Sequence, residues 1–281
     1  MARVIVKIGT SSLTGELGQV DEAMVAELCQ QVADVRGQGH QVVVVSSGAV
    51  SAGVAALGLQ QRPADLPTLQ ALAALGQPRM MATWTRSLAD HHAVAAQVLM
   101  VPHDFVNRRQ YLHARQTLVR LLDLGCVPVV NENDAVANDE IRFGDNDRLA
   151  ALVAHLVSAD VLLLLTDLDG LFTTDPRRGA DATLIAHVPA DDPILGVVAG
   201  GTGSARGRGG MASKLAAARI ASWSGVQAII ARADRPHVVA GAVAGVEGIG
   251  VDEVGDERCE PVVVAEADLA GRHRVVLVDD R

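Results

Sequence analysis

The sequence predicts an α/β protein in which helices wrap a mainly parallel sheet. Short β-branched runs alternate along the chain with longer stretches whose apolar residues recur at helical spacing, as is typical of βαβ units. Residues 127–130 and 161–165 are apolar at every position, which indicates strands buried on both faces. With 281 residues, the chain suits one large domain of this kind or two small ones.

The expected elements follow this alternation from the N-terminus onward. Strands are predicted at residues 4–8, 41–45, 93–100, 127–130, 161–165 and 225–231, and those at 93–100, 127–130 and 161–165 are predicted to be buried. A helix begins after Asp21, a suitable N-cap, and stops near Gly37 and Gly39. Further helices are expected after Gly48 and at residues 65–90, 150–156 and 212–222. For the last thirty residues two alternatives stay open: they add an edge strand or two to the sheet, or they form a loosely attached tail.

Composition excludes several classes of function. The net charge of -9 argues against nucleic acid or an anionic membrane as the main partner. No apolar run approaches the ~18 residues of a membrane span, and the first residues, MARVIVKIGTSS, lack the layout of a signal peptide. Cys29, Cys126 and Cys259 are widely spaced and fit reduced thiols. We therefore expect a cytoplasmic protein.

Polar residues gather at the carboxyl ends of the predicted strands, where ligands bind in open α/β sheets. Lys7 precedes the turn at Gly9, so its ammonium group can reach a phosphate while the glycine lets backbone N–H groups approach. A surface lysine beside a strand is the alternative. Because most of the 24 basic residues are arginines, a lysine at this position is informative.

Two further clusters suit a small anionic or zwitterionic ligand. Ser46, Ser47 and Gly48 lead into a helix, whose N-terminus attracts a carboxylate or phosphate, although an ordinary serine N-cap explains them too. The run NEND at 131–134 follows a buried strand. In it, Asp134 can hold an ammonium group, and the asparagines, including Asn131, can orient a carboxylate or an amide.

The remaining clusters suit phosphate chemistry. The run GDND at 144–147 opens a helix, where acidic residues also complement the helix dipole. Its functional interpretation assigns Asn146 to substrate binding and Asp147 to positioning a lysine or Mg²⁺. The run TDLDG at 166–170 follows a strand, and the glycine loop at 207–210 leads to a helix carrying Lys214. A glycine loop, a helix N-terminus and a lysine together favour phosphate binding.

Together these stretches resemble the amino acid kinase family, and within it the glutamate 5-kinases. The matching stretches are VKIGTSSLT at 6–14, VVSSGAVSAG at 44–53, VPVVNENDAV at 127–136, FGDNDRLAALVA at 143–154, LLLLTDLDGLFTTDPR at 162–177 and GGMASKLAAA at 209–218. Acetylglutamate kinase, aspartokinase and uridylate kinase share the fold and the lysines but lack NENDAV combined with GDND.

The resemblance implies a three-layer αβα sandwich with a mainly parallel central sheet. It implies a kinase domain over residues 1–250, in which about 1–158 bind glutamate and about 159–250 bind ATP, followed by an unassigned tail at 251–281. Glutamate would contact Ser47, Gly48, Asn131, Asp134, Asp145 and Asn146. ATP would contact Lys7, Thr166, Asp167, Arg208, Gly209, Gly210, Met211, Ala212, Ser213 and Lys214. Lys7 and Lys214 would flank the transferred phosphoryl group, with Asp147 holding both.

The implied reaction is transfer of the γ-phosphoryl group from MgATP to the glutamate side-chain carboxylate, the first step of proline biosynthesis. The resemblance further implies Mg²⁺ carried with ATP, feedback inhibition by proline, and a dimer or tetramer with the helix at 65–90 as a plausible interface. A carboxylate is already a nucleophile at neutral pH, so no general base is expected.

Two departures from the family pattern bear on these expectations. The family usually has GTGGM where this chain has GRGGM, so Arg208 replaces a small hydroxyl. Many members also carry a C-terminal PUA domain, which we do not expect here. Two alternatives stay open: a kinase of the same fold acting on acetylglutamate or aspartate, and an inactive sensor of nucleotide or amino acid. The intact Lys7, Asp147 and Lys214 favour an enzyme.

Overall fold

The structure is a computed structural model, and it describes residues 1–15, 17–137, 146–174, 182–185, 188–189, 210–247, 263–267 and 273–277. Its strands are β1 (Arg3–Ile8), β2 (Gln41–Ser46), β3 (Ala95–Met100), β4 (Val127–Glu132), β5 (Val161–Thr166), β6 (Val188–Pro189), β7 (Gln227–Arg232), β8 (Val263–Ala267) and β9 (His273–Leu277). Its helices are α1 (Thr10–Leu13), α2 (Glu22–Gly37), α3 (Ala49–Ala56), α4 (Leu66–Ala89), α5 (His103–Val106), α6 (Arg108–Asp123), α7 (Asn146–Leu156), α9 (Met211–Trp223) and α10 (Val238–Glu247).

Six parallel strands form the central sheet in the order β3-β4-β2-β1-β5-β7. The chain therefore builds outward from β1, through β2 on one side and through β5 on the other. With right-handed crossovers, the helices that lead from β1 to β2 and from β2 to β3 (α2 and α4) cover one face of the sheet. The helices that lead back from β3 to β4 and on to β5 and β7 (α6, α7 and α9) cover the other. The carboxyl end of β1 lies at this change of direction, which is where open α/β sheets bind ligands.

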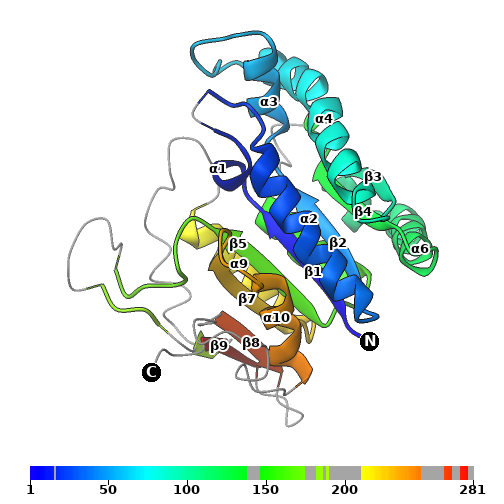
Figure 1. The fold of residues 1–281 in the computed structure, drawn as a ribbon, viewed down its shortest axis with the longest axis vertical. Coiled ribbons are helices and arrows are strands. Elements are labelled where there is room, and N and C mark those ends of the chain that lie inside the picture. Colours follow the sequence, from blue (N-terminus) through cyan, green and yellow to red (C-terminus); the bar gives the residue numbers. More distant parts are fainter. Residues whose placement is uncertain are drawn as a thin grey trace.

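Helices cover both faces of the sheet, so the predicted three-layer sandwich is confirmed. Alternate residues of a strand point to opposite faces. Accordingly, Ile5 packs in a cluster with residues of α6, α7 and α9, whereas Val4 and Val6 pack in a second cluster with residues of α2, α4 and α10. In Figure 1, α2 and α10 cross in front of the strands.

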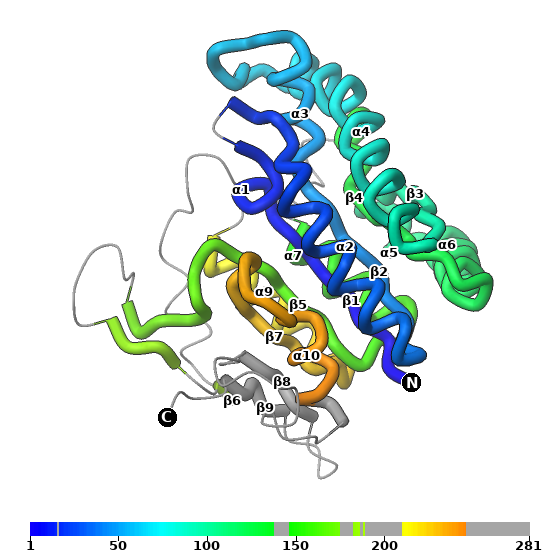
Figure 2. Tube along the Cα trace, viewed as in Figure 1, coloured from blue at the N-terminus to red at the C-terminus, as the bar shows by residue number. Residues whose placement is uncertain are grey.

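The predicted N-cap at Asp21 is confirmed, and the helix expected at residues 65–90 also begins after an acidic N-cap, Asp65. The side chain of Asp21 accepts a hydrogen bond from the backbone N–H of Met24, and that of Asp65 accepts one from Thr68. Each bond satisfies a backbone donor that the first turn of a helix leaves unpaired. The second of these helices, α4, lies side by side with α3 at one end of the molecule (Figure 2).

Several predicted boundaries were wrong. Strand β4 continues through Asn131 and Glu132, which the sequence placed after the strand, and α7 begins at Asn146 rather than near residue 150. Strand β3 was expected to be buried, but it lies at one edge of the central sheet, and its Gln97 is exposed. Helices α6 and α10 were not predicted.

The C-terminal residues that the structure describes form strands, but not at the edge of the central sheet. Strands β8 and β9 pair antiparallel with each other, and β9 pairs with β6 in a separate three-stranded sheet. This sheet unites the tail with a strand from the middle of the chain. The rest of the tail lies outside the described residues.

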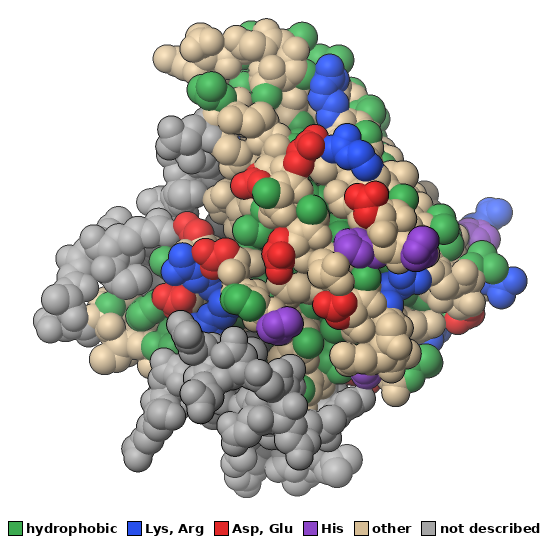
Figure 3. Space-filling view, in the orientation of Figure 1, with side chains coloured by type: hydrophobic (Ala, Val, Ile, Leu, Met, Phe, Trp, Pro, Cys, Tyr) green, Lys and Arg blue, Asp and Glu red, His purple; other side chains and the backbone are tan. Residues whose placement is uncertain are grey.

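The described surface shows mixed charge. Figure 3 shows acidic and basic side chains interspersed on one face, without a continuous basic area on its described part. Within the described ranges, no helix is long and apolar enough to cross a lipid bilayer.

Candidate active site

Three charged side chains meet at the centre of the fold. Lys7 forms an ion pair with Oδ1 of Asp147, and the Nζ of Lys214 lies 3.1 Å from Oδ2 of the same residue. All three are buried, and Asp147 has no exposed surface. Lys7 and Lys214 are the only lysines in the sequence. A chain that otherwise relies on arginine therefore keeps both of its lysines beside one carboxylate.

The arrangement follows from the strand pattern and the packing of two helices. Lys7 and Ile5 share a face of β1, the face covered by α7 and α9. Asp147 lies in the first turn of α7, where the helix dipole favours a negative charge, and Lys214 lies in the first turn of α9. The Oγ of Ser213 lies 2.8 Å from Oδ2 of Asp147.

The carboxylate of Asp147 is held in its charged form. Burial by itself raises the pKa of Asp147, but the ammonium groups of Lys7 and Lys214 and the hydrogen bonds from Lys7 and Ser213 outweigh it. The pKa of Asp147 is therefore well below its ordinary value. The two ammonium groups beside this carboxylate suit an incoming anion.

A cluster of amides and hydroxyls adjoins the charged group. The Nδ2 of Asn146 lies 2.8 Å from Oγ of Ser47, 2.8 Å from Oδ1 of Asn131 and 3.3 Å from the carbonyl oxygen of Ser46. The ends of β2 and β4 thus converge on the start of α7. Because Asn146 and Asp147 are neighbours in sequence, the polar cluster and the charged group share the first turn of one helix.

The turn at Ser47 is not an ordinary serine cap. Gly48 occupies the N-cap position of α3 with a φ of 103°, and no side chain caps the helix. A residue other than glycine would be strained there. Since Ser47 does not cap α3, its hydroxyl is committed to Asn146 instead.

Other predicted residues lie at the same edge of the sheet. Thr166 ends β5, and its hydroxyl lies 3.2 Å from Oδ1 of Asp167. Gly210, Met211 and Ala212 lead into α9. Asp134 lies in the turn that follows β4. Asp145, Arg208 and Gly209 lie outside the described residues.

Two contributors were missed by the sequence analysis. Gln77 of α4 contacts Asn131, and the indole N–H of Trp84 donates to Oγ of Ser46 at 3.0 Å. Ser213, predicted to contact ATP, also lies beside Asp147, a contact that the sequence did not predict. Gln77 and Trp84 stand in no strand-end motif, so no local pattern could reveal them. Among the described residues, no group of three His, Cys, Asp or Glu side chains could hold a metal ion.

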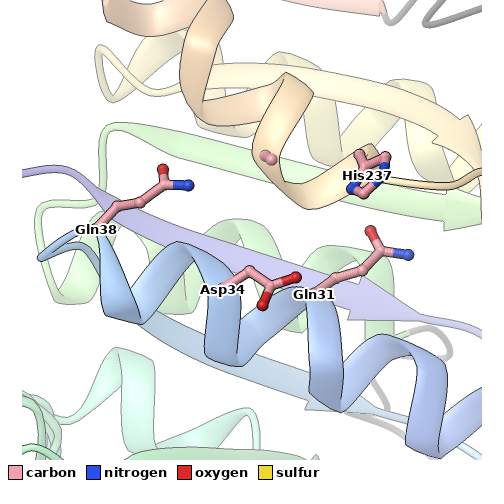
Figure 4. Close-up of a pocket in the computed structure, with 5 residues that line it drawn as sticks. Gln31, Asp34, Gln38 and His237 are labelled. Carbon is pink, nitrogen blue, oxygen red and sulfur yellow. The ribbon is translucent and has the colours of Figure 1, made fainter. Parts of the chain in front are cut away.

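A separate pocket of about 350 Å³ lies between α2 and α10, on the other face of the sheet. Figure 4 shows Gln31, Asp34 and Gln38 along α2, with His237 opposite them at the start of α10. Gln31 is buried there because its side chain bonds to backbone atoms of Arg235 and Val239. This pocket is distinct from the lysine–aspartate group.

The fold is that of the amino acid kinases. A carbamate kinase from Giardia lamblia bound to AMP-PNP superposes with a TM-score of 0.59 at 14% identity, over 88% of this chain and 96% of that one. A UMP kinase from Bacillus anthracis gives 0.59 at 17% identity, over 87% and 92%. At these identities the likeness concerns the fold alone.

Sequence comparison shows the family: the chain belongs to the amino acid kinase family, whose sequence model matches residues 2–232. It is 52% identical over 228 residues to a glutamate 5-kinase of Pseudomonas putida, covering 81% of this chain and 61% of that protein. It is 49% identical over 243 residues to a glutamate 5-kinase of Ectopseudomonas mendocina, covering 86% and 65%. The chain thus spans less than two thirds of the length of these curated relatives.

Proposed function

We propose that this protein phosphorylates the side-chain carboxylate of L-glutamate with ATP, giving γ-glutamyl phosphate, the first step of proline biosynthesis. The observation that carries the proposal is the junction on α7, where the amide cluster at Asn146 adjoins the lysine pair at Asp147. The relatives at about half identity support the choice of glutamate.

The chemistry requires little beyond charge and position. A carboxylate, with a pKa near ~4, is already a nucleophile at neutral pH, so no general base is needed. The obstacle is repulsion between the acceptor carboxylate and the γ-phosphate. Lys7 and Lys214 would offset this repulsion, while Asp147 holds both ammonium groups in fixed positions.

The two substrates would approach from different parts of the chain. Glutamate would bind in residues 1–158 and contact Ser47, Gly48, Asn131, Asp134, Asp145 and Asn146. ATP would bind in residues 159–250 and contact Thr166, Asp167 and the loop from Arg208 to Lys214. These roles stay predictions. The meeting of Lys7 and Asp147 from the first portion with Lys214 from the second supports a reaction between the portions.

Mg²⁺ would accompany the nucleotide, since the described residues form no carboxylate cage for it and kinases commonly bind Mg²⁺ through substrate phosphates. Bound in that way, Mg²⁺ supplies positive charge to the phosphate oxygens. The chain's own contribution is the two fixed ammonium groups and the N–H groups at the start of α9.

A hydroxylamine trap tests the proposal directly. The purified protein is mixed with MgATP, hydroxylamine and one acceptor, either glutamate, acetylglutamate or aspartate, because hydroxylamine converts an acyl phosphate into a coloured hydroxamate. We expect colour with glutamate alone. Colour only with another acceptor would keep the mechanism and overturn the substrate. Folded protein that gives no colour with any acceptor would favour a nucleotide or amino-acid sensor.

Regulation and assembly are part of the proposal. Proline is expected to inhibit by binding at or near the glutamate site, so added proline should reduce the hydroxamate signal and raise the KM for glutamate. A dimer or tetramer is expected, with α4 as a plausible interface, and light scattering measures its mass. A cytoplasmic location stays a prediction.

A further inference from the structure

Gln77 lies outside every motif that predicted the site, yet its side chain contacts that site. Its Oε1 accepts a hydrogen bond from Nδ2 of Asn131 at 2.8 Å. The residue is half-buried on α4, between Gly76 and Pro78. The side-chain amide of Gln77 therefore connects α4 to the end of β4.

The amide of Asn131 has only one orientation that satisfies its neighbours. Its Oδ1 lies 2.8 Å from the backbone nitrogen of Glu132, and a backbone N–H can only donate. Oδ1 must therefore face Glu132, and Nδ2 must face Gln77. Because Asn131 is buried, this Nδ2 needs an acceptor, and Gln77 supplies one.

The orientation of the Asn131 side-chain amide in turn fixes the orientation of the Asn146 side-chain amide. Oδ1 of Asn131 also accepts from Nδ2 of Asn146 at 2.8 Å, and the carbonyl oxygen of Ser46, an acceptor only, lies 3.3 Å from the same Nδ2. The Oδ1 of Asn146 therefore faces away from both. This atom is buried and has no hydrogen-bond partner among the described residues. A buried acceptor of this kind favours a ligand that donates to it.

We propose that Gln77 is a positioning residue that sets this relay of amides, so that Oδ1 of Asn146 accepts a hydrogen bond from the α-ammonium group of the acceptor amino acid. The inference deepens the proposed function and rests on it. It names the substrate class as amino acids with a free ammonium group. Gln77 acts through Asn131 and Asn146 and does not touch the substrate.

The test uses the fact that Gln77 serves as an acceptor. Gln77→Glu keeps an acceptor oxygen at the same reach, whereas Gln77→Met keeps the length and removes the acceptor. Gln116→Met, at an exposed position of α6, controls for the exchange itself. We expect Gln77→Met to raise the KM for glutamate about tenfold, in line with the loss of one buried hydrogen bond. Gln77→Glu should stay within about twofold of wild type, and the KM for ATP should not change in either variant.

A second ligand separates positioning from folding. Glutarate has the side-chain carboxylate but no ammonium group, so its inhibition constant should barely change in Gln77→Met while the KM for glutamate rises. Equal effects of Gln77→Met and Gln77→Glu on the KM for glutamate would show that Gln77 has a merely structural role. Equally weakened binding of glutamate, glutarate and ATP, together with a lower Tm, would show the same. Wild-type protein that makes no hydroxamate from glutamate would count against the proposed function instead, and so the two failures are distinguishable.

Discussion

Lys214 reaches Asp147 from a different helix and a later part of the chain, with its Nζ 3.1 Å from Oδ2, while Lys7 pairs with the other oxygen. Buried ion pairs contribute little net stability, because removing charges from water offsets their attraction. Three buried charges on separate elements are therefore better explained by function. An arriving phosphate would be attracted by the two ammonium groups that Asp147 holds.

Replacing Asp147 by asparagine should both inactivate and destabilise the protein. The variant removes the carboxylate that both buried ammonium groups contact, and breaking a buried pair typically costs about 3–5 kcal/mol. Urea denaturation at pH 7 measures the free energy of unfolding, and the hydroxamate assay measures activity. Asp123→Asn, at an exposed position of α6, serves as the control and should match wild type. An Asp147→Asn protein as stable as this control would refute the energetic account.

The stability contributed by Asp147 should depend on pH in one direction. Its folded-state pKa lies below the ordinary value of 3.8, so the contribution is complete above about pH 4 and is lost as pH falls toward the folded-state pKa. The difference in unfolding free energy between wild type and Asp147→Asn should therefore be constant from pH 7 to pH 5 and shrink below pH 4. A difference that instead shrinks between pH 7 and pH 5 would assign the effect to another group.

Each lysine should be individually essential. Losing one preorganised charge at a reacting centre typically costs about 10²–10³ in rate, and we expect at least that for Lys7→Ala and for Lys214→Ala. Arginine should not restore activity at either position, because its planar fork differs from a compact ammonium group. Arg219→Ala, on the exposed side of α9 where Arg219 stacks on Trp223, is the matched control. Near-wild-type kcat in either lysine variant would remove that lysine from the mechanism.

The fold was largely predictable because its signals are local. Continuous apolar runs marked β4 and β5, and the acidic N-cap Asp21 marked the start of α2. Strand β3 is also mostly apolar in sequence, but it lies at an edge of the sheet. The amino-acid sequence of a strand does not show how many strands pair with it. Helix α6 was missed because only Leu118 and Leu122 of it are buried, which leaves its apolar face narrow.

The site was predictable where residues sit at strand ends and not where they arrive from helix sides. Lys7, Asn131 and Thr166 end parallel strands, so their convergence follows from topology. Gln77 and Trp84 reach the same place from the middle of α4, and their positions depend on how α4 packs on α3. That packing is a tertiary property which no short motif encodes.

The crossing of α3 and α4 should tolerate no side chain at Gly76. A Cβ there would lie 1.8 Å from the carbonyl oxygen of Ala49 and 2.5 Å from the backbone nitrogen of Gly53, both in α3, so the helices must separate. Overpacking of this kind costs about 1–3 kcal/mol. Because α3 starts directly after Ser47 and Gly48, Gly76→Ala should also raise the KM for glutamate.

Gly241→Ala is the matched control, since nothing in the described structure lies within 4 Å of its added Cβ. Within α10 that change should stabilise the protein by about 0.5–1 kcal/mol. Urea denaturation of both variants decides the matter: equal stabilities would mean that the close approach of α3 to α4 does not govern this part of the fold.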